Sequence, residues 1–78
     1  MATRKEHWRI KIFDRRTDCW AWYRIGKHAA KFADRPSATR EISNLRGTPL
    51  LGDAAAEVVK IPAGADADKY LGNIEDSL

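Results

Sequence analysis

The aromatic and basic side chains best suited to binding another molecule are concentrated in one stretch of the chain, between His7 and Lys31. All three tryptophans of the 78-residue sequence lie here, in two strand-like runs, His7–Phe13 and Cys19–Ile25, in which rings alternate with cations. A tryptophan is costly to expose, and its ring N–H needs a partner when it is buried. Cations interleaved with rings are typical of a surface that binds an anionic partner.

The candidate binding residues follow from this alternation. Side chains on one face of a strand recur about every 7 Å, so cations two residues apart form a row. Turns at the strand ends add further cations, and rings between them can stack on bases or anchor a protein interface. The predicted partner-binding residues are Arg9, Lys11, Arg15, Arg16, Trp20, Trp22, Arg24 and Lys27.

The phase of the second run decides whether the tryptophans belong to this surface. In one arrangement Ala21, Tyr23 and Ile25 face the core, and Trp20 and Trp22 flank the basic side chains. In the other the tryptophans face the core, where they bury more apolar area. We expect the first, and the sequence leaves the second open.

No pattern in the sequence indicates catalysis or a bound metal or cofactor. There is no Gly-rich phosphate loop, no CxxC pair and no HExxH motif. Cys19 is expected to be a small buried residue, because a nucleophile needs a base within reach and a third group to orient it. Asp14 and Asp18 bracket the arginine turn and are expected to cap local backbone groups. His28 is expected to be an ordinary strand residue. We predict no enzyme, no catalytic residue, no metal site and no cofactor.

Size and charge favour a small binding domain. A chain of this length forms one domain and buries only about 60% of its unfolded surface, which leaves little room for a deep cavity. The net charge of +3 is uneven: residues 1–35 carry a net +6 and residues 62–78 a net −3. This asymmetry indicates either an anionic partner for the basic half or screening of that half by the acidic tail.

The single cysteine excludes an intramolecular disulfide and fits a reducing compartment. No stretch approaches the roughly 20 apolar residues of a membrane span, and the N-terminus has no apolar targeting segment. We therefore expect a soluble cytoplasmic protein, a monomer or weak dimer without a membrane partner.

The elements expected to position the surface have the order β-β-β-α-β. The strands are predicted at 7–13, 19–25, 28–33 and 57–61, with a turn at Gly26-Lys27. The helix is expected to begin at an Asp34 cap and to end at Gly47. This is an α+β fold: an antiparallel sheet of three to four strands with one amphipathic helix on one face and the other face open.

Residues 1–62 are predicted to form this single domain, and 63–78 an acidic tail that is docked or disordered. The helix should bury a stripe of Ala38, Ile42 and Leu45, with Glu41 among the outward residues. Leu50 and Leu51 are expected to close the core edge. In the tail, Tyr70, Ile74 and Leu78 recur at helical spacing.

Two resemblances add to this interpretation. Trp20, Trp22, Gly26-Lys27, Phe32 and a helix beginning near Ser37 resemble the three-strand-plus-helix DNA-binding modules at the N-termini of phage integrases, over residues 19–45. The longer spacer before the helix and the added last strand depart from that pattern. This resemblance implies DNA contacts by Arg9, Lys11, Trp22 and Arg24.

The whole chain is similar in type to the small anti-CRISPR proteins of phages: a single-sheet protein with a charged face and no catalytic motif. The resemblance rests on size, architecture and charge, and no signature residue carries it. It implies a non-enzymatic inhibitor in the host cytoplasm that binds a CRISPR effector complex and blocks recruitment of target DNA. The alternative is a small DNA- or RNA-binding protein that uses the same basic and aromatic face.

Overall fold

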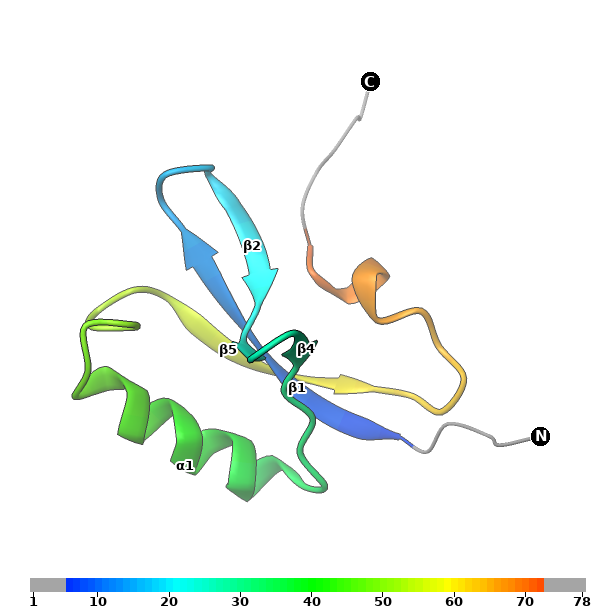
Figure 1. Ribbon diagram of the computed structural model, residues 1–78. Helices are drawn as coiled ribbons and strands as arrows, with labels where there is room; N and C mark the ends of the chain where they lie inside the picture. Colours follow the sequence, from blue (N-terminus) through cyan, green and yellow to red (C-terminus); the bar gives the residue numbers. More distant parts are fainter. Residues whose placement is uncertain (1–5, 73–78) are drawn as a thin grey trace.

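Three strands, one long helix and a separate small hairpin make up the fold (Figure 1). The computed structural model describes residues 6–72. The elements are β1 (His7–Asp14), β2 (Cys19–Trp22), β3 (Arg24–Ile25), β4 (His28–Ala29), α1 (Arg35–Arg46), β5 (Ala56–Ile61) and the 3-10 helix η1 (Ala67–Tyr70). The main sheet is antiparallel with the order β2-β1-β5, and β3 pairs with β4. The predicted α+β class, a small antiparallel sheet with one helix, is confirmed.

β1 is the central strand because it pairs along both edges. Its alternation places Trp8, Ile10 and Ile12 on one face, as predicted, and Ile10 is completely buried. Tyr23 pairs opposite Ile10 through its backbone N–H, and its hydroxyl donates a 2.9 Å hydrogen bond to Glu41 of α1. The helix therefore covers the Ile10 face of the sheet.

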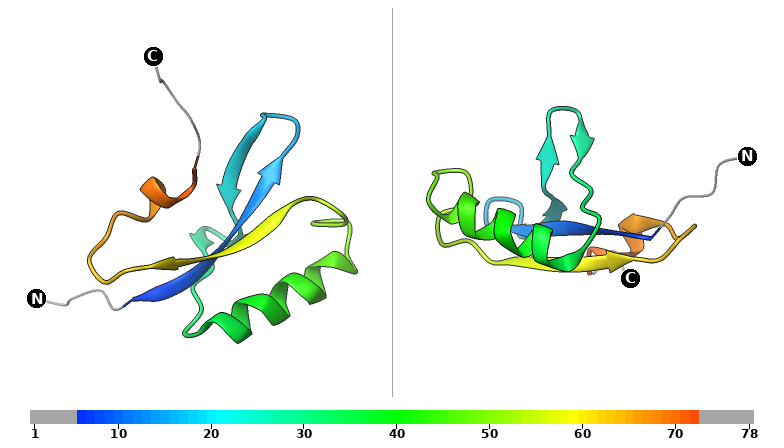
Figure 2. Two further views of the ribbon diagram at one scale, coloured as in Figure 1. Left: turned by 180° about the vertical axis from the view of Figure 1, so that it is seen from behind. Right: turned by 90° about the horizontal axis from the view of Figure 1, so that it is seen from below.

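The predicted third strand, 28–33, is wrong in its extent. The chain leaves the edge of β1 after the Tyr23 N–H bonds the Ile10 carbonyl (2.7 Å), and it returns where Phe32 exchanges two backbone bonds with Trp8 (2.8 and 2.9 Å). Between these points β3 and β4 form a short hairpin that stands away from the sheet (Figure 2). Its turn is the predicted Gly26-Lys27 pair, where Gly26 takes a φ of +67° that suits glycine.

Helix α1 begins and packs as its sequence predicts, with one exception. Asp34 is the N-cap and accepts a 2.9 Å bond from the Ser37 backbone N–H. Ala38 and Leu45 are buried and Ile42 is half-buried, which confirms the position of the apolar stripe. Glu41, predicted to face outward, is half-buried instead, because it accepts the Tyr23 hydroxyl.

The Asp34 cap makes stability depend on pH. The Ser37 backbone N–H, and to a lesser degree the Arg40 charge, hold the pKa of Asp34 below its ordinary value. A lowered folded pKa stabilises the fold above the unfolded pKa, about 3.9, and this stabilisation is lost as the pH falls through the folded pKa. We expect the free energy of unfolding to fall less between about pH 5 and about pH 2 in Asp34→Asn than in the wild type. Urea titrations across this range test it; identical pH profiles would contradict it.

The second face of the sheet is not left open, contrary to the prediction. The chain turns back after β5, and η1 packs against that strand. Ile61 is completely buried and Ala67 nearly so. Helix α1 and the segment around η1 lie on opposite sides of the sheet in Figure 1. Ile74 and Leu78, the rest of the spacing that begins at Tyr70, lie outside the described residues.

Three further burial predictions are wrong for local reasons. Cys19 is exposed, because it pairs opposite Asp14 on the outer strand, beyond the part of the sheet that α1 contacts. Ile25 is 61% exposed because it lies in the projecting hairpin. Leu51 is buried but Leu50 is 64% exposed, since neighbouring residues of a tight turn point in different directions.

Candidate functional site

The strand register brings the tryptophans to the cations. Lys11 pairs opposite Trp22, and Phe13 opposite Trp20, so both rings share the β1 face that carries Arg9 and Lys11. This confirms that the tryptophans lie on the basic face, as in the first of the two phases. Of the three residues expected to face the core in that phase, Tyr23 is half-buried, but Ala21 and Ile25 are exposed. Trp20 also meets Phe13 edge-on, with ring centroids 5.4 Å apart.

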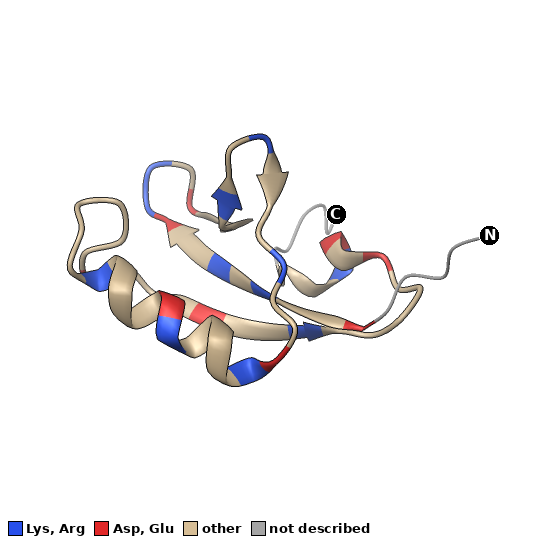
Figure 3. Cartoon of the chain, turned by 60° about the horizontal axis from the view of Figure 1, so that its bottom comes forward, with Lys and Arg blue, Asp and Glu red and all other residues tan. Residues whose placement is uncertain are grey.

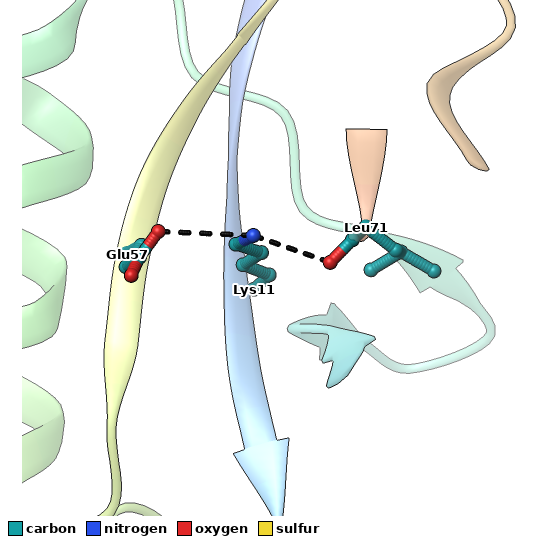
Figure 4. Close-up of polar contacts among 3 residues, drawn as sticks. All are labelled: Lys11, Glu57 and Leu71. Atoms are coloured by element: carbon teal, nitrogen blue, oxygen red, sulfur yellow. Dashed lines mark hydrogen bonds and ion pairs between the residues drawn. The ribbon is translucent and has the colours of Figure 1, made fainter. Parts of the chain in front are cut away.

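Lys11 lies at the centre of this face and is nearly enclosed. Its side chain is 13% exposed, and its Nζ lies 4.5 Å from the centroid of the Trp20 ring. Nζ donates a 3.2 Å hydrogen bond to the Leu71 carbonyl and lies 3.7 Å from Glu57 Oε1 (Figure 4). A Cβ on Gly72, whose φ is +83°, would come within 3.2 Å of Nζ. The chain after η1 is therefore packed closely onto this lysine.

Trp22 and Arg9 are engaged in the same way. The Arg9 guanidinium carbon lies 5.4 Å from the Trp22 ring centroid, and Arg9 Nε donates to His7 Nε2 at 3.0 Å. The Trp22 indole N–H donates a 3.2 Å hydrogen bond to Asp68 Oδ1 of η1. Lys11 and Trp22 thus both bond to the acidic segment that follows β5. These two bonds agree with the alternative in which the acidic tail screens part of the basic half of the chain.

The hydrogen bond from the Trp22 indole N–H to Asp68 predicts that loss of the Asp68 charge speeds solvent exchange of the indole proton. In Asp68→Asn the indole N–H exchanges a charged acceptor, worth about 1.5–3 kcal/mol, for a neutral one, worth about 0.5–1.5 kcal/mol, so about 1 kcal/mol is lost. We expect solvent exchange of the Trp22 indole proton to become about three- to tenfold faster, while the backbone amide of Ile10 is unaffected. NMR of the full chain measures both.

Asp53→Asn is the matched control, because it removes an exposed carboxylate from a different part of the chain. An unchanged Trp22 exchange rate in Asp68→Asn would mean that this bond does not hold the segment on the sheet.

The other predicted cations are open to solvent. Arg15 and Arg16 occupy the β1–β2 turn, in which Asp14 Oδ1 accepts the Arg16 backbone N–H at 2.8 Å. Asp18 closes the turn with a φ of +59°, and its N–H bonds the Asp14 carbonyl. Asp14 therefore caps a local backbone group as predicted, whereas Asp18 takes part in the turn through its own backbone N–H. The Arg16 side chain is 91% exposed, with its Nε 3.6 Å from Asp14 Oδ1.

Arg24 and Lys27 belong to the projecting hairpin and not to the row of cations on the main sheet. Both are exposed, and the Arg24 guanidinium donates to the Lys27 carbonyl across the hairpin. In Figure 3 basic residues mark both the β1–β2 turn and the β3–β4 hairpin. The predicted set is thus divided: Arg9, Lys11, Trp20 and Trp22 are half-buried, and Arg15, Arg16, Arg24 and Lys27 are exposed.

An open groove of about 620 Å³ lies beside the exposed arginines. Ile12, Ala21 and Tyr23 come from the sheet face that carries α1, and the loop after α1 contributes the apolar side chains of Pro49, Leu50 and Ala54. Burial raises the pKa of Tyr23, and the hydrogen bond to Glu41 adds to this effect. The phenol therefore stays protonated and fixed at the wall of the groove.

Charged side chains surround this apolar lining. Arg15, Arg16 and Arg24 line the groove together with Asp14 and Asp53. Sequence reasoning identified the arginines but missed the apolar part. The signal was the Leu50-Leu51 pair in a turn bounded by Pro49 and Gly52, where one leucine must remain exposed.

The arrangement can bind an anionic molecule through charge and apolar contact. Among residues 6–72 there is no group of three or more His, Cys, Asp or Glu side chains that could hold a metal ion. No helix in the same range is long and apolar enough to cross a membrane. Comparison of the chain with protein-family models, with curated proteins and with solved structures gave no match.

Proposed function

We propose that this protein is a non-enzymatic inhibitor that docks, through the turn Arg15-Arg16 and the hairpin carrying Arg24 and Lys27, onto an anionic surface of a larger complex. The expected target, from the similarity in type to small phage anti-CRISPR proteins, is a CRISPR effector complex, with loss of target DNA recruitment as the result. The observation that carries the proposal is the group of exposed arginines around an open groove.

The state of the tryptophans favours occlusion of a protein surface over base stacking. A ring that stacks on bases must present a free face. Trp20 lies against Lys11 and Phe13, and Trp22 lies against Arg9 with its N–H on Asp68. Stacking on bases would compete with these contacts for the rings. Docking through the exposed arginines disturbs none of them.

Co-elution and nucleic-acid titration test the proposal together. The full chain is passed over a gel-filtration column with each of a panel of purified CRISPR effector complexes, and is titrated separately into labelled single- and double-stranded DNA at low and high salt. We expect co-elution with an effector complex, reduced binding of target DNA by that complex, and weak direct DNA binding.

Tight DNA binding with a steep salt dependence, and no co-elution, would contradict the inhibitor and indicate a nucleic-acid-binding protein. Each result is measured on the full chain.

A further inference from the structure

We infer that the groove beside Leu50 is a docking site for a protein segment in which an apolar side chain is flanked by acidic residues. The inference rests on the proposed function and adds to it the chemistry of the contacted partner. The inferred contact surface is the groove lining formed by Leu50 and Tyr23, next to Arg15 and Arg16. The distribution of charge alone does not identify this apolar part of the surface.

The apolar lining has the size and composition of a recognition site. Its volume of about 620 Å³ lies within the range of roughly 300–1,000 Å³ common for ligand sites. Leu50 is 64% exposed although its neighbour Leu51 is buried, so the loop presents one leucine to solvent at this edge. Leu50 lines the groove together with Pro49, Ala54 and Ile12, and a contiguous apolar surface with a polar rim is typical of an interaction site.

The wall opposite Leu50 is fixed rather than loose. Ile12 and Ala21 pair directly across β1 and β2, and the Tyr23 hydroxyl is held by Glu41. On the loop side, Arg46 Nη1 donates to the carbonyls of Gly52 and Ala54 at 3.1 and 3.0 Å, which ties the loop to α1. The groove is therefore formed before a partner arrives, and binding loses little conformational entropy.

Charge complementarity selects the occupant. The three arginines that line the groove exceed its two aspartates, and Asp14 is already engaged by the Arg16 backbone N–H and guanidinium. Carboxylates of a partner can pair with guanidinium groups in two-pronged geometry, while its apolar side chain covers Leu50. A nucleic-acid backbone offers the charge but no aliphatic side chain for the groove, so an acidic protein segment fits better.

The test uses short fluorescein-labelled peptides as probes of the full chain. In the first peptide a Leu-Phe pair is flanked on both sides by Asp and Glu; in the second, Ser-Ser replaces Leu-Phe; an oligothymidylate of equal length is the third probe. Fluorescence anisotropy measures each affinity. We expect the Leu-Phe peptide to bind about five- to tenfold more tightly than the Ser-Ser peptide, because only the former covers the apolar lining.

Leu50→Ser should remove this difference between the peptides. Ile25→Ser is the matched control, since Ile25 is equally exposed but does not line the groove, and it should preserve the difference. Both residues are exposed, so neither change disturbs the core.

Equal affinity for the two peptides, or an unchanged preference in Leu50→Ser, would overturn the inference, and so would tighter binding of the oligothymidylate than of either peptide. These outcomes are distinct from failure of the proposed function. In that case charge reversal of Arg15 and Arg16 would leave inhibition of the effector complex unaltered, whatever the peptides do.

Discussion

Under the proposed function, replacing Arg15 and Arg16 together by glutamate is expected to weaken binding to a CRISPR effector complex by about 100-fold at low salt. The change alters the charge of the β1–β2 turn by four units, and both side chains are exposed. One pair of unit charges about 4 Å apart in water interacts by about 1 kcal/mol. Four such units, reduced by screening, correspond to about 3 kcal/mol, or about 100-fold in affinity.

The fold is expected to survive this double substitution. The turn is closed by Asp14 and Asp18 through backbone bonds that do not involve the arginine side chains. The matched control is Arg35→Glu with Arg40→Glu, which makes the same change in net charge on exposed positions of α1. Surface plasmon resonance of each variant on the immobilised effector complex gives the affinities. Equal losses in the two double variants would mean that net charge, and not the turn, drives binding.

Ile10→Ala is expected to destabilise the fold by about 2–5 kcal/mol, the range for truncating a buried isoleucine. Ile10 is completely buried at the centre of the central strand, between β5 and the path of the chain after β2. A domain of this size has only about 3–5 kcal/mol of stability from its core. A large fraction of the variant should therefore be unfolded at 25 °C.

Urea denaturation followed by circular dichroism measures this loss. Ile25→Ala is the control, because it removes the same atoms from a side chain that is 61% exposed, and it should change stability by less than about 0.5 kcal/mol. If the two variants were equally stable, Ile10 would not be at the centre of the core.

The parts of the fold that depend on local sequence could be predicted. The alternation in His7–Asp14 predicts β1, and the Asp34 cap followed by Pro36 predicts the start of α1. Gly26-Lys27 predicts the turn of the β3–β4 hairpin. Each of these signals lies within a few residues of the element it specifies, so no distant contact is needed to interpret it.

What could not be predicted depends on contacts far apart in the sequence. The return of the chain to β1 at Phe32 requires the Trp8 backbone as its partner, and no residue near Phe32 encodes this. The bonds from Lys11 to Leu71 and from Trp22 to Asp68 join positions 60 and 46 residues apart. The acidic composition of the tail is compatible with its packing on Lys11 and Trp22 but does not by itself predict these contacts.

The charged residues of the candidate site could be predicted from the sequence, but the groove and the segment that covers part of the site could not. The alternation correctly grouped Arg9 and Lys11 with Trp20 and Trp22, but it did not show that the chain itself covers Lys11 and Trp22. Exposure of Arg15 and Arg16 followed from their place in a turn. The groove was missed because it joins the β1–β2 hairpin to the loop after α1, and only the tertiary fold brings these together.

Hydrogen–deuterium exchange of the full chain, free and bound to the effector complex with which it co-elutes, tests the central claim most directly. If the open arginine groove is the docking surface, binding slows exchange in residues 15–18, 24–27 and 48–54 and leaves α1 unchanged. Most residues of these three segments are exposed in the free protein, so added protection of their amides on binding is readily measured. Protection confined to α1, or to the sheet face under η1, would contradict the claim.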